Sequence, residues 1–299
     1  MSGEALAPRV YRENRNGFLP AYLFRRGNCL CVAGENGEKE KGPYDWVVDF
    51  GYSRDGYRVS VPLDERIIAN SLCRPNMRFL GFTFPKVRMA MRQITDLANT
   101  GSPRIPEDKE KYCRSLAKVY HALAEEVGEI VGKERALLLP PKNGGIFVAQ
   151  EYQKYGFPHE DIYDFHLSRI PKDGNLLVGV GVGEENPSIA NYRTFVVGDD
   201  CIATDVSAFT TMLMIREGLA KEKIPFSEVR VVIAVSAATQ RGMESLTSPE
   251  TKEYFGFRSI TAIAAVPVYS LNDHFYLTED DGRYTAGDMG DWTEPIPAV

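Results

Sequence analysis

The residues best suited to chemistry in this sequence are two consecutive acids, Asp199 and Asp200, which follow the apolar run 195–197. A short turn after them leads into a second apolar stretch, from Ser207, whose length is typical of a helix. Helix N-termini bind anions because their first N–H groups have no intrahelical partner. Paired carboxylates suit ribose hydroxyls and Mg²⁺, which prefers oxygen ligands. The segment therefore predicts a site for a sugar phosphate and magnesium, with an ordinary capped strand–turn–helix corner as the alternative.

Three further segments carry groups that could contact a ligand. The run LLLPPKNGGI places Lys142 in a turn after a strand-like stretch, where its ammonium group could hold a phosphate as a point charge. Arg169 ends the segment FHLSR. The motif GDMGD at 287–291 sets two acids and two glycines at fixed offsets, which suits a loop that reads a flat base through its backbone. The alternatives are a purely structural corner for the Lys142 turn, a solvated side chain for Arg169 and a surface tail for 287–291.

The elements that must position these groups alternate from residue 107 onward between apolar runs and stretches of helical periodicity. We expect strands at Ala136–Leu139, Leu176–Val182, Thr194–Val197, Val229–Val235 and Ile260–Val268. We expect helices at Glu107–Val131, Ile146–Tyr155 and Ser207–Ala220, and another that starts at Gly242. This alternation implies crossover connections and a mostly parallel sheet covered on both faces. Ligands of such sheets bind at the carboxyl ends of the strands.

The first hundred residues have a different texture, and we assign 1–100 to an N-terminal extension of unknown role. Strand-like runs occur at 22–24, 29–32 and 46–50. The Gly-rich and charged stretch 34–41 between them is typical of a hairpin tip. Apolar side chains recur at helical spacing over 84–97. The segment NTGSPRIP at 99–106 predicts a boundary, after which the second domain is expected to span 107–299.

Composition restricts the class of protein. Of 299 residues, 43% are hydrophobic and 25% charged, which indicates a folded core rather than disorder. The net charge of −6 argues against a nucleic-acid scaffold, which would need a basic stripe to neutralise phosphates. We find no apolar run of transmembrane length and no signal peptide, and therefore expect a cytoplasmic protein that binds no membrane. The five cysteines form no CxxC pair and are expected to be buried reduced thiols.

The segment from Asp199 to Ala208 resembles the loop that binds 5-phosphoribosyl-1-pyrophosphate (PRPP) in type I phosphoribosyltransferases. In the uracil-specific branch this loop typically reads D-P-M-L-A-T-G-G-S-A. The present sequence follows that pattern at Asp199, Ala203, Thr204, Ser207 and Ala208. It departs from it at Asp205 and Val206, where the family has two glycines that let the backbone approach a phosphate closely.

Three other segments are similar to the same family. The stretch 271–277 keeps the L-N-x-x-x-Y-(I/L) spacing of the base-binding segment, and 287–291 keep its G-D-x-G-D motif. The connection 278–286 between them is longer than the family's, by about five residues. Lys142 and Gly144 stand where the family has the arginine and glycine of its pyrophosphate turn. The ordered set of matches covers about Lys111 to Trp292.

The resemblance implies an α/β fold like that of type I phosphoribosyltransferases, with a twisted, mainly parallel sheet flanked by helices and an N-terminal β-rich extension. It implies that a homodimer transfers the phosphoribosyl group of PRPP to uracil or another pyrimidine-like base, as in pyrimidine salvage, and releases pyrophosphate. Asp199 and Asp200 would be catalytic and would hold Mg²⁺. PRPP would contact Lys142, Asn143, Gly144, Arg169, Ala203, Thr204, Asp205, Val206 and Ser207. The base would contact Tyr276, Leu277, Gly287, Asp288, Met289 and Gly290. A non-catalytic module that senses PRPP or nucleotides, and an enzyme that cleaves or rearranges a nucleotide, are the alternatives.

Overall fold

The structure is a computed structural model. It describes residues 22–24, 46–49, 75–172, 175–203, 206–268, 270–271, 277–278, 282–286 and 292–293. The chain divides into two units. The first unit contains residues 1–58 and 164–186, and the second contains 59–163 and 187–299.

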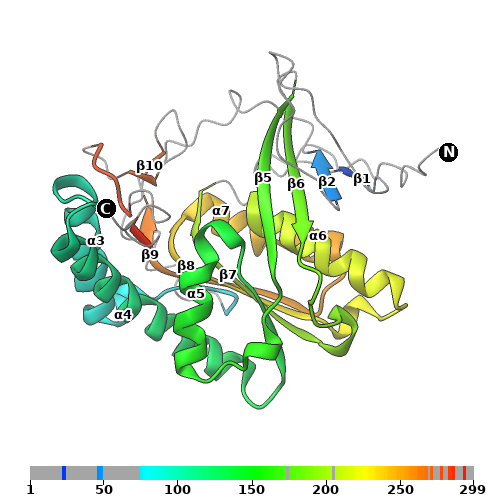
Figure 1. The fold of residues 1–299 in the computed structure, drawn as a ribbon. Coiled ribbons are helices and arrows are strands. Elements are labelled where there is room, and N and C mark those ends of the chain that lie inside the picture. Colours follow the sequence, from blue (N-terminus) through cyan, green and yellow to red (C-terminus); the bar gives the residue numbers. More distant parts are fainter. Residues whose placement is uncertain are drawn as a thin grey trace. The chain divides into compact units, whose positions relative to one another are not determined.

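The second unit is built on a five-stranded parallel sheet (Figure 1). Its strands, in spatial order, are β3 (Met77–Phe79), β9 (Ser259–Val268), β8 (Arg230–Thr239), β7 (Thr194–Ile202) and β4 (Ala136–Leu139). Most side chains of the three long strands are buried on both faces, as expected where helices cover both faces of a parallel sheet. The predicted mainly parallel sheet flanked by helices is confirmed.

Seven α-helices of this unit lie within the described residues. They are α2 (Leu80–Thr83), α3 (Pro85–Thr100), α4 (Pro106–Val131), α5 (Lys142–Tyr155), α6 (Val206–Lys221), α7 (Gln240–Leu246) and α8 (Pro249–Phe255). Helices α3, α4 and α5 share one apolar core with strands β4, β7, β8 and β9. The apolar stripe predicted for α4 is confirmed, since its residues Leu116, Val119 and Leu123 have no exposed surface. Helix α6 instead packs on α8, through the rings of Phe209 and Phe255.

The predicted boundary at 99–106 falls between two helices of this same unit. Strand β3 pairs in parallel with β9, and α3 packs against α4, so residues 77–100 belong to the unit that carries the acids. Glycine, proline and polar residues at 99–106 mark a short surface turn between two helices as readily as a linker between domains.

The first unit contains a four-stranded antiparallel sheet. Its order is β1 (Tyr22–Phe24), β2 (Trp46–Asp49), β6 (Asn175–Val182) and β5 (Phe165–Lys172). The antiparallel pairing of β1 with β2 agrees with the predicted hairpin, although the run 29–32 and the tip lie outside the described residues. The run 176–182 was expected among the parallel strands, and that expectation is wrong. Only two residues separate β5 from β6, and so short a connection can join only antiparallel strands.

A charged cluster joins the amino ends of β4 and β7 in the second unit. Arg135 directly precedes β4, and its Nε donates to the two carboxylate oxygens of Asp161 at 2.9 and 3.0 Å. The hydroxyl of Tyr192, just before β7, donates to Asp161 Oδ1 at 2.7 Å. Burial alone would raise the pKa of Asp161, but the hydrogen bonds from Arg135 and Tyr192 outweigh it and lower that pKa. The cluster fixes the chain segment around Asp161 at the edge of the sheet away from the paired acids.

Two further sequence expectations concern membranes and cysteines. Among the helices that the structure describes, none combines the length and the apolar character that crossing a bilayer requires. Cys113 and Cys201 are half-buried, and the other three cysteines lie outside the described residues. Burial raises the pKa of the Cys113 thiol, which donates to the carbonyl of Trp292 at 3.3 Å. Cys113 therefore has the environment of a structural thiol.

Candidate functional site

Helices begin directly after strands β4, β7 and β8, so their first turns lie at the carboxyl edge of the sheet (Figure 1). Two glycines allow this arrangement. A Cβ on Gly145 in α5 would lie 2.6 Å from the carbonyl carbon of Pro140, and a Cβ on Gly242 in α7 would lie 2.5 Å from Ile202 Cγ2. Neither distance is possible for a real side chain without movement of its neighbours. Glycine therefore lets both helices start close to the strand ends.

The acid pair lies within this edge, near the carboxyl end of β7, an interior strand. Asp199 is buried, with 7% of its surface exposed, and Asp200 is half-buried. The Asp200 N–H donates to Asp199 Oδ1 at 2.8 Å, and the Cys201 N–H donates to Asp200 Oδ1 at 2.8 Å. The Ser236 hydroxyl on β8 donates to the Asp200 carbonyl at 2.6 Å. Backbone donors thus fix one oxygen of each carboxylate.

Tyr120 of α4 approaches the acid pair from within the protein. Burial raises the pKa of its hydroxyl well above the usual range, and the negative charges of Asp200 and Asp199 raise that pKa further, while Ser236 acts in the opposite direction. No described residue makes a hydrogen bond of regular geometry with this hydroxyl. At physiological pH it is therefore a protonated group beside two carboxylates. Sequence reasoning missed Tyr120 and Ser236, although a serine within the apolar run of β8 was a usable signal.

The turn after the acids connects β7 to α6. The carbonyl of Ala203 accepts a hydrogen bond from the Thr239 hydroxyl at 2.9 Å, and the same Thr239 oxygen accepts the Gly242 N–H at 3.0 Å at the start of α7. Val206 is the first residue of α6 and is buried, and Ser207 follows it half-buried. The prediction that Ser207 lies at the start of a helix is confirmed. Thr204 and Asp205 lie outside the described residues.

The basic residues predicted to hold pyrophosphate lie in two different units. Lys142, Asn143 and Gly144 form the first turn of α5, four residues before the predicted start of that helix. Arg169 lies on β5 in the first unit. The side chains of these residues are outside the described part of the structure, so their roles stay predictions.

Of the residues predicted to bind the base, the structure describes only Leu277. It lies on β11 (Leu277–Thr278), opposite Leu271 of β10 (Ser270–Leu271). Its side chain is buried in the core that contains α4, and its carbonyl accepts the Thr285 N–H at 3.0 Å. Tyr276 and residues 287–290 lie outside the described residues. A role for Leu277 would therefore belong to its backbone.

The residues at the carboxyl end of β7 fit a magnesium ion that is shared with a substrate. Asp199 and Asp200 supply carboxylate oxygens, the ligands that Mg²⁺ prefers. Within the described ranges no cluster of three or more His, Cys, Asp or Glu residues could enclose a metal. Mg²⁺ usually keeps several waters and binds through one or two carboxylates together with substrate oxygens. Two acids are sufficient for a site of that kind.

No protein-family model and no curated protein matches the chain. Several solved structures overlap part of it. Xanthine-guanine-hypoxanthine phosphoribosyltransferase from Helicobacter pylori is 10% identical, with 52% of this chain and 84% of that chain covered and a TM-score of 0.37. Purine phosphoribosyltransferase from Pyrococcus horikoshii is 13% identical, with coverages of 52% and 83% and a TM-score of 0.35. Orotate phosphoribosyltransferase from Aeropyrum pernix is 16% identical, with coverages of 55% and 77% and a TM-score of 0.33.

Overlaps of this size and identity establish neither a family nor an activity. The fold described above stands on the strand order and the parallel pairing of this chain itself. The resemblance to the uracil branch stays a prediction from the sequence.

Proposed function

We propose that this protein transfers the 5-phosphoribosyl group of PRPP to a nitrogenous base and releases pyrophosphate. The observation that supports it most is the position of Asp199 and Asp200, at the carboxyl end of an interior parallel strand that leads directly into α6. Ligands of open α/β sheets bind at this edge, and the residues between 199 and 208 carry the resemblance to the PRPP loop.

The proposed reaction breaks the bond between C1 of the ribose and the pyrophosphate oxygen, and its electron pair leaves with pyrophosphate. A lone pair on a nitrogen of the base forms the new bond to C1, and the proton on that nitrogen leaves to water. Asp199 and Asp200 would hold the ribose hydroxyls and stabilise the positive charge that develops on the ribose. Lys142 and Arg169 would bind pyrophosphate. Magnesium, when bound, would neutralise charge on the leaving group.

The finer parts of the proposal rest on the sequence resemblance. Uracil or another pyrimidine-like heterocycle would be the acceptor, in pyrimidine salvage. Tyr276, Leu277, Gly287, Asp288, Met289 and Gly290 would contact it. We further propose a cytoplasmic homodimer that uses Mg²⁺. The longer connection 278–286 favours another pyrimidine-like heterocycle over uracil.

A non-catalytic module that senses PRPP or nucleotides is the second candidate, because Asp205 and Val206 replace the two glycines of the family's loop. The Val206 side chain is buried, with 3% of its surface exposed, so it takes no room on the solvent side of the turn. Calorimetric titration with PRPP, with and without Mg²⁺, tests both candidates. Binding that requires Mg²⁺ is expected from the proposed transferase. A folded protein that binds neither PRPP nor any nucleotide contradicts both.

Replacing Asp205 with glycine should tighten PRPP binding. A carboxylate about 5 Å from a phosphate is repelled by a few kcal/mol at an effective dielectric constant near 20, and solvent screening reduces this to about 1 kcal/mol. We therefore expect the Kd for PRPP to fall by about fivefold in Asp205→Gly, less at high salt, measured by calorimetry. Asp205→Asn is the matched control. It removes the charge alone and should lower the Kd for PRPP almost as much as Asp205→Gly. Unchanged Kd values in both variants would place the carboxylate away from the phosphate.

A further inference from the structure

An open pocket of about 250 Å³ lies at the carboxyl end of β9, where Val266 and Pro267 line it together with Gly81 of α2. A Cβ on Gly81 would lie 2.8 Å from the Ala265 carbonyl oxygen and 3.2 Å from Val266 Cγ1, so glycine lets α2 pack against this strand end and form part of the pocket floor. The pocket is distinct from the acid pair but lies at the same edge of the sheet.

The strand register fixes how far the pocket lies from the acids. Val266 of β9 pairs with Ala237 of β8, and Ala237 pairs with Cys201 of β7, the residue after Asp200. Neighbouring strands are about 4.8 Å apart, so the pocket lies roughly 10 Å across the sheet from the acid pair. A ligand of two linked parts, or two ligands side by side, could occupy both places.

The wall of the pocket carries an excess of positive charge. Helix α3 presents Arg88, Arg92 and Asp96 at intervals of four residues, and Arg283 contributes from the turn after β11. The described lining residues therefore include three guanidinium groups and one carboxylate. Asp96 lies 3.7 Å from Arg283, whereas neither Arg88 nor Arg92 forms an ion pair with a described residue. Arg92 and Asp96 carry opposite charges four residues apart on the helix, and Arg88 lies over the Phe82 ring, with its Cζ 5.8 Å from the ring centroid. Arg88 and Arg92 are both exposed.

The floor of the pocket suits a ring rather than a bare ion. Met91 and Pro267 are buried apolar side chains, and Phe82 adds an aromatic ring at the rim. Thr285 is 2% exposed, and its buried hydroxyl has no hydrogen-bond partner among the described residues. Its carbonyl accepts from the Thr95 hydroxyl at 2.5 Å, which fixes this turn against α3. Buried apolar side chains beside charged groups can pack against a ring while the charged groups fix its orientation.

We propose that this pocket binds a small ring-containing ligand through an anionic group, either a carboxylate or a phosphate, held by Arg88, Arg92 and Arg283. Guanidinium groups match both anions with paired N–H donors. Arg283 and Thr285 both lie in the lengthened connection 278–286, so part of the site comes from that extra length. We assign the anionic group to the acceptor base, and this assignment rests on the proposed function. A nucleotide phosphate is the other source of the same chemistry.

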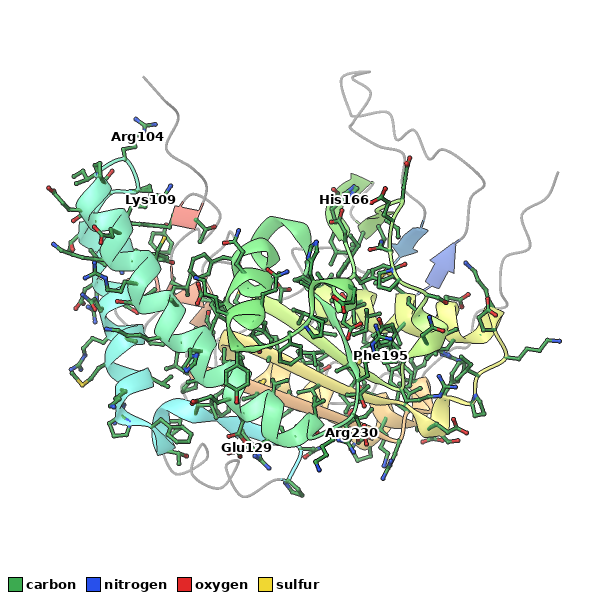
Figure 2. All side chains as sticks on the ribbon, turned by 60° about the horizontal axis from the view of Figure 1, so that its bottom comes forward. Arg104, Lys109, Glu129, His166, Phe195 and Arg230 are labelled. Carbon is green, nitrogen blue, oxygen red and sulfur yellow. The ribbon has the colours of Figure 1, made fainter. Side chains whose placement is uncertain are left out.

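The test compares matched probes that differ only in the anionic group, by calorimetry and without PRPP. Orotate against uracil tests a carboxylate, and adenosine 5′-monophosphate against adenosine tests a phosphate. At least one charged probe should bind about tenfold more tightly than its neutral partner, as one charge-assisted hydrogen bond allows. Arg92→Gln and Arg88→Gln should each remove most of that advantage. Arg104→Gln is the control, because Arg104 is an exposed arginine in the turn between α3 and α4, outside the pocket (Figure 2).

Each outcome decides the proposal. An advantage for orotate supports a carboxylated acceptor, and an advantage for the monophosphate supports a nucleotide. Equal binding of charged and neutral probes would contradict the proposed anion site. So would a difference in affinity that Arg88→Gln and Arg92→Gln leave unchanged. A protein that binds orotate through these arginines but never releases pyrophosphate would refute the proposed transferase and leave the pocket standing.

Discussion

Asp200→Asn should reduce turnover by about 10²- to 10³-fold, the usual effect of removing one group that stabilises charge in a transition state. The substitution keeps the shape of the side chain and its Oδ1, so the hydrogen bond from the Cys201 N–H, 2.8 Å in the wild type, can persist. Only the negative charge of the side chain is lost. The measurement is kcat from pyrophosphate release at saturating PRPP and base.

A matched control separates this effect from general loss of charge. Glu222 is exposed just after α6, and Glu222→Gln should retain full activity. The melting temperature of Asp200→Asn should stay within a few degrees of wild type, because the group is half-buried and its backbone contact is kept. Wild-type kcat in the folded Asp200→Asn variant would exclude Asp200 from the chemistry.

Gly145→Ala should destabilise the protein and weaken the site at the same time. The new Cβ would meet the carbonyl carbon and the Cβ of Pro140 at 2.6 Å, and backbone atoms cannot rotate away as the end of a long side chain can. Overpacking of this kind costs about 1–3 kcal/mol of unfolding free energy. Urea denaturation measures it. Because the clash displaces the first turn of α5, the KM for PRPP should rise as well.

Gly128→Ala in α4 is the comparison for that variant. There the new Cβ would meet only the ring of Tyr155, at 3.1 Å, and alanine has the higher helix propensity by about 1 kcal/mol. We expect Gly128→Ala to be neutral or slightly stabilising, with KM for PRPP unchanged. If Gly145→Ala unfolds at the same urea concentration as wild type and keeps its KM, the close packing of α5 on Pro140 does not hold in solution.

Local sequence patterns predicted those strands and helices whose apolar residues are contiguous or recur at regular spacing. Strand β4 has the predicted bounds, and α4 begins one residue earlier than predicted. The apolar run of β7 stops at Val197, so a strand ending there was expected. Strand β7 in fact continues to Ile202, because backbone pairing with β8 extends through Asp199↔Val235 and Cys201↔Ala237. Ladder hydrogen bonds do not require apolar side chains, and this is why the acids lie inside the strand rather than after it.

Other features depend on contacts between residues far apart in the sequence. An apolar run does not show whether its strand is parallel or antiparallel to its neighbours. Only the two-residue connection between β5 and β6 indicated an antiparallel pair. Tyr120 reaches the acids because α4 packs on the sheet, and no local pattern contains that contact. In the same way, Arg88 and Arg92 of α3 line one pocket with Arg283, which lies far from them in the sequence. Tertiary packing, rather than spacing, assembled these groups.

Release of pyrophosphate is the most direct test of the proposed transferase. The folded protein should be incubated with PRPP, Mg²⁺ and a panel of pyrimidine-like bases that includes uracil and orotate. We predict pyrophosphate release that requires all three components and matches, mole for mole, the nucleoside 5′-monophosphate formed. Pyrophosphate release no greater than in the base-free control, across the whole panel and with PRPP bound, would contradict the proposed transferase and favour the sensing module.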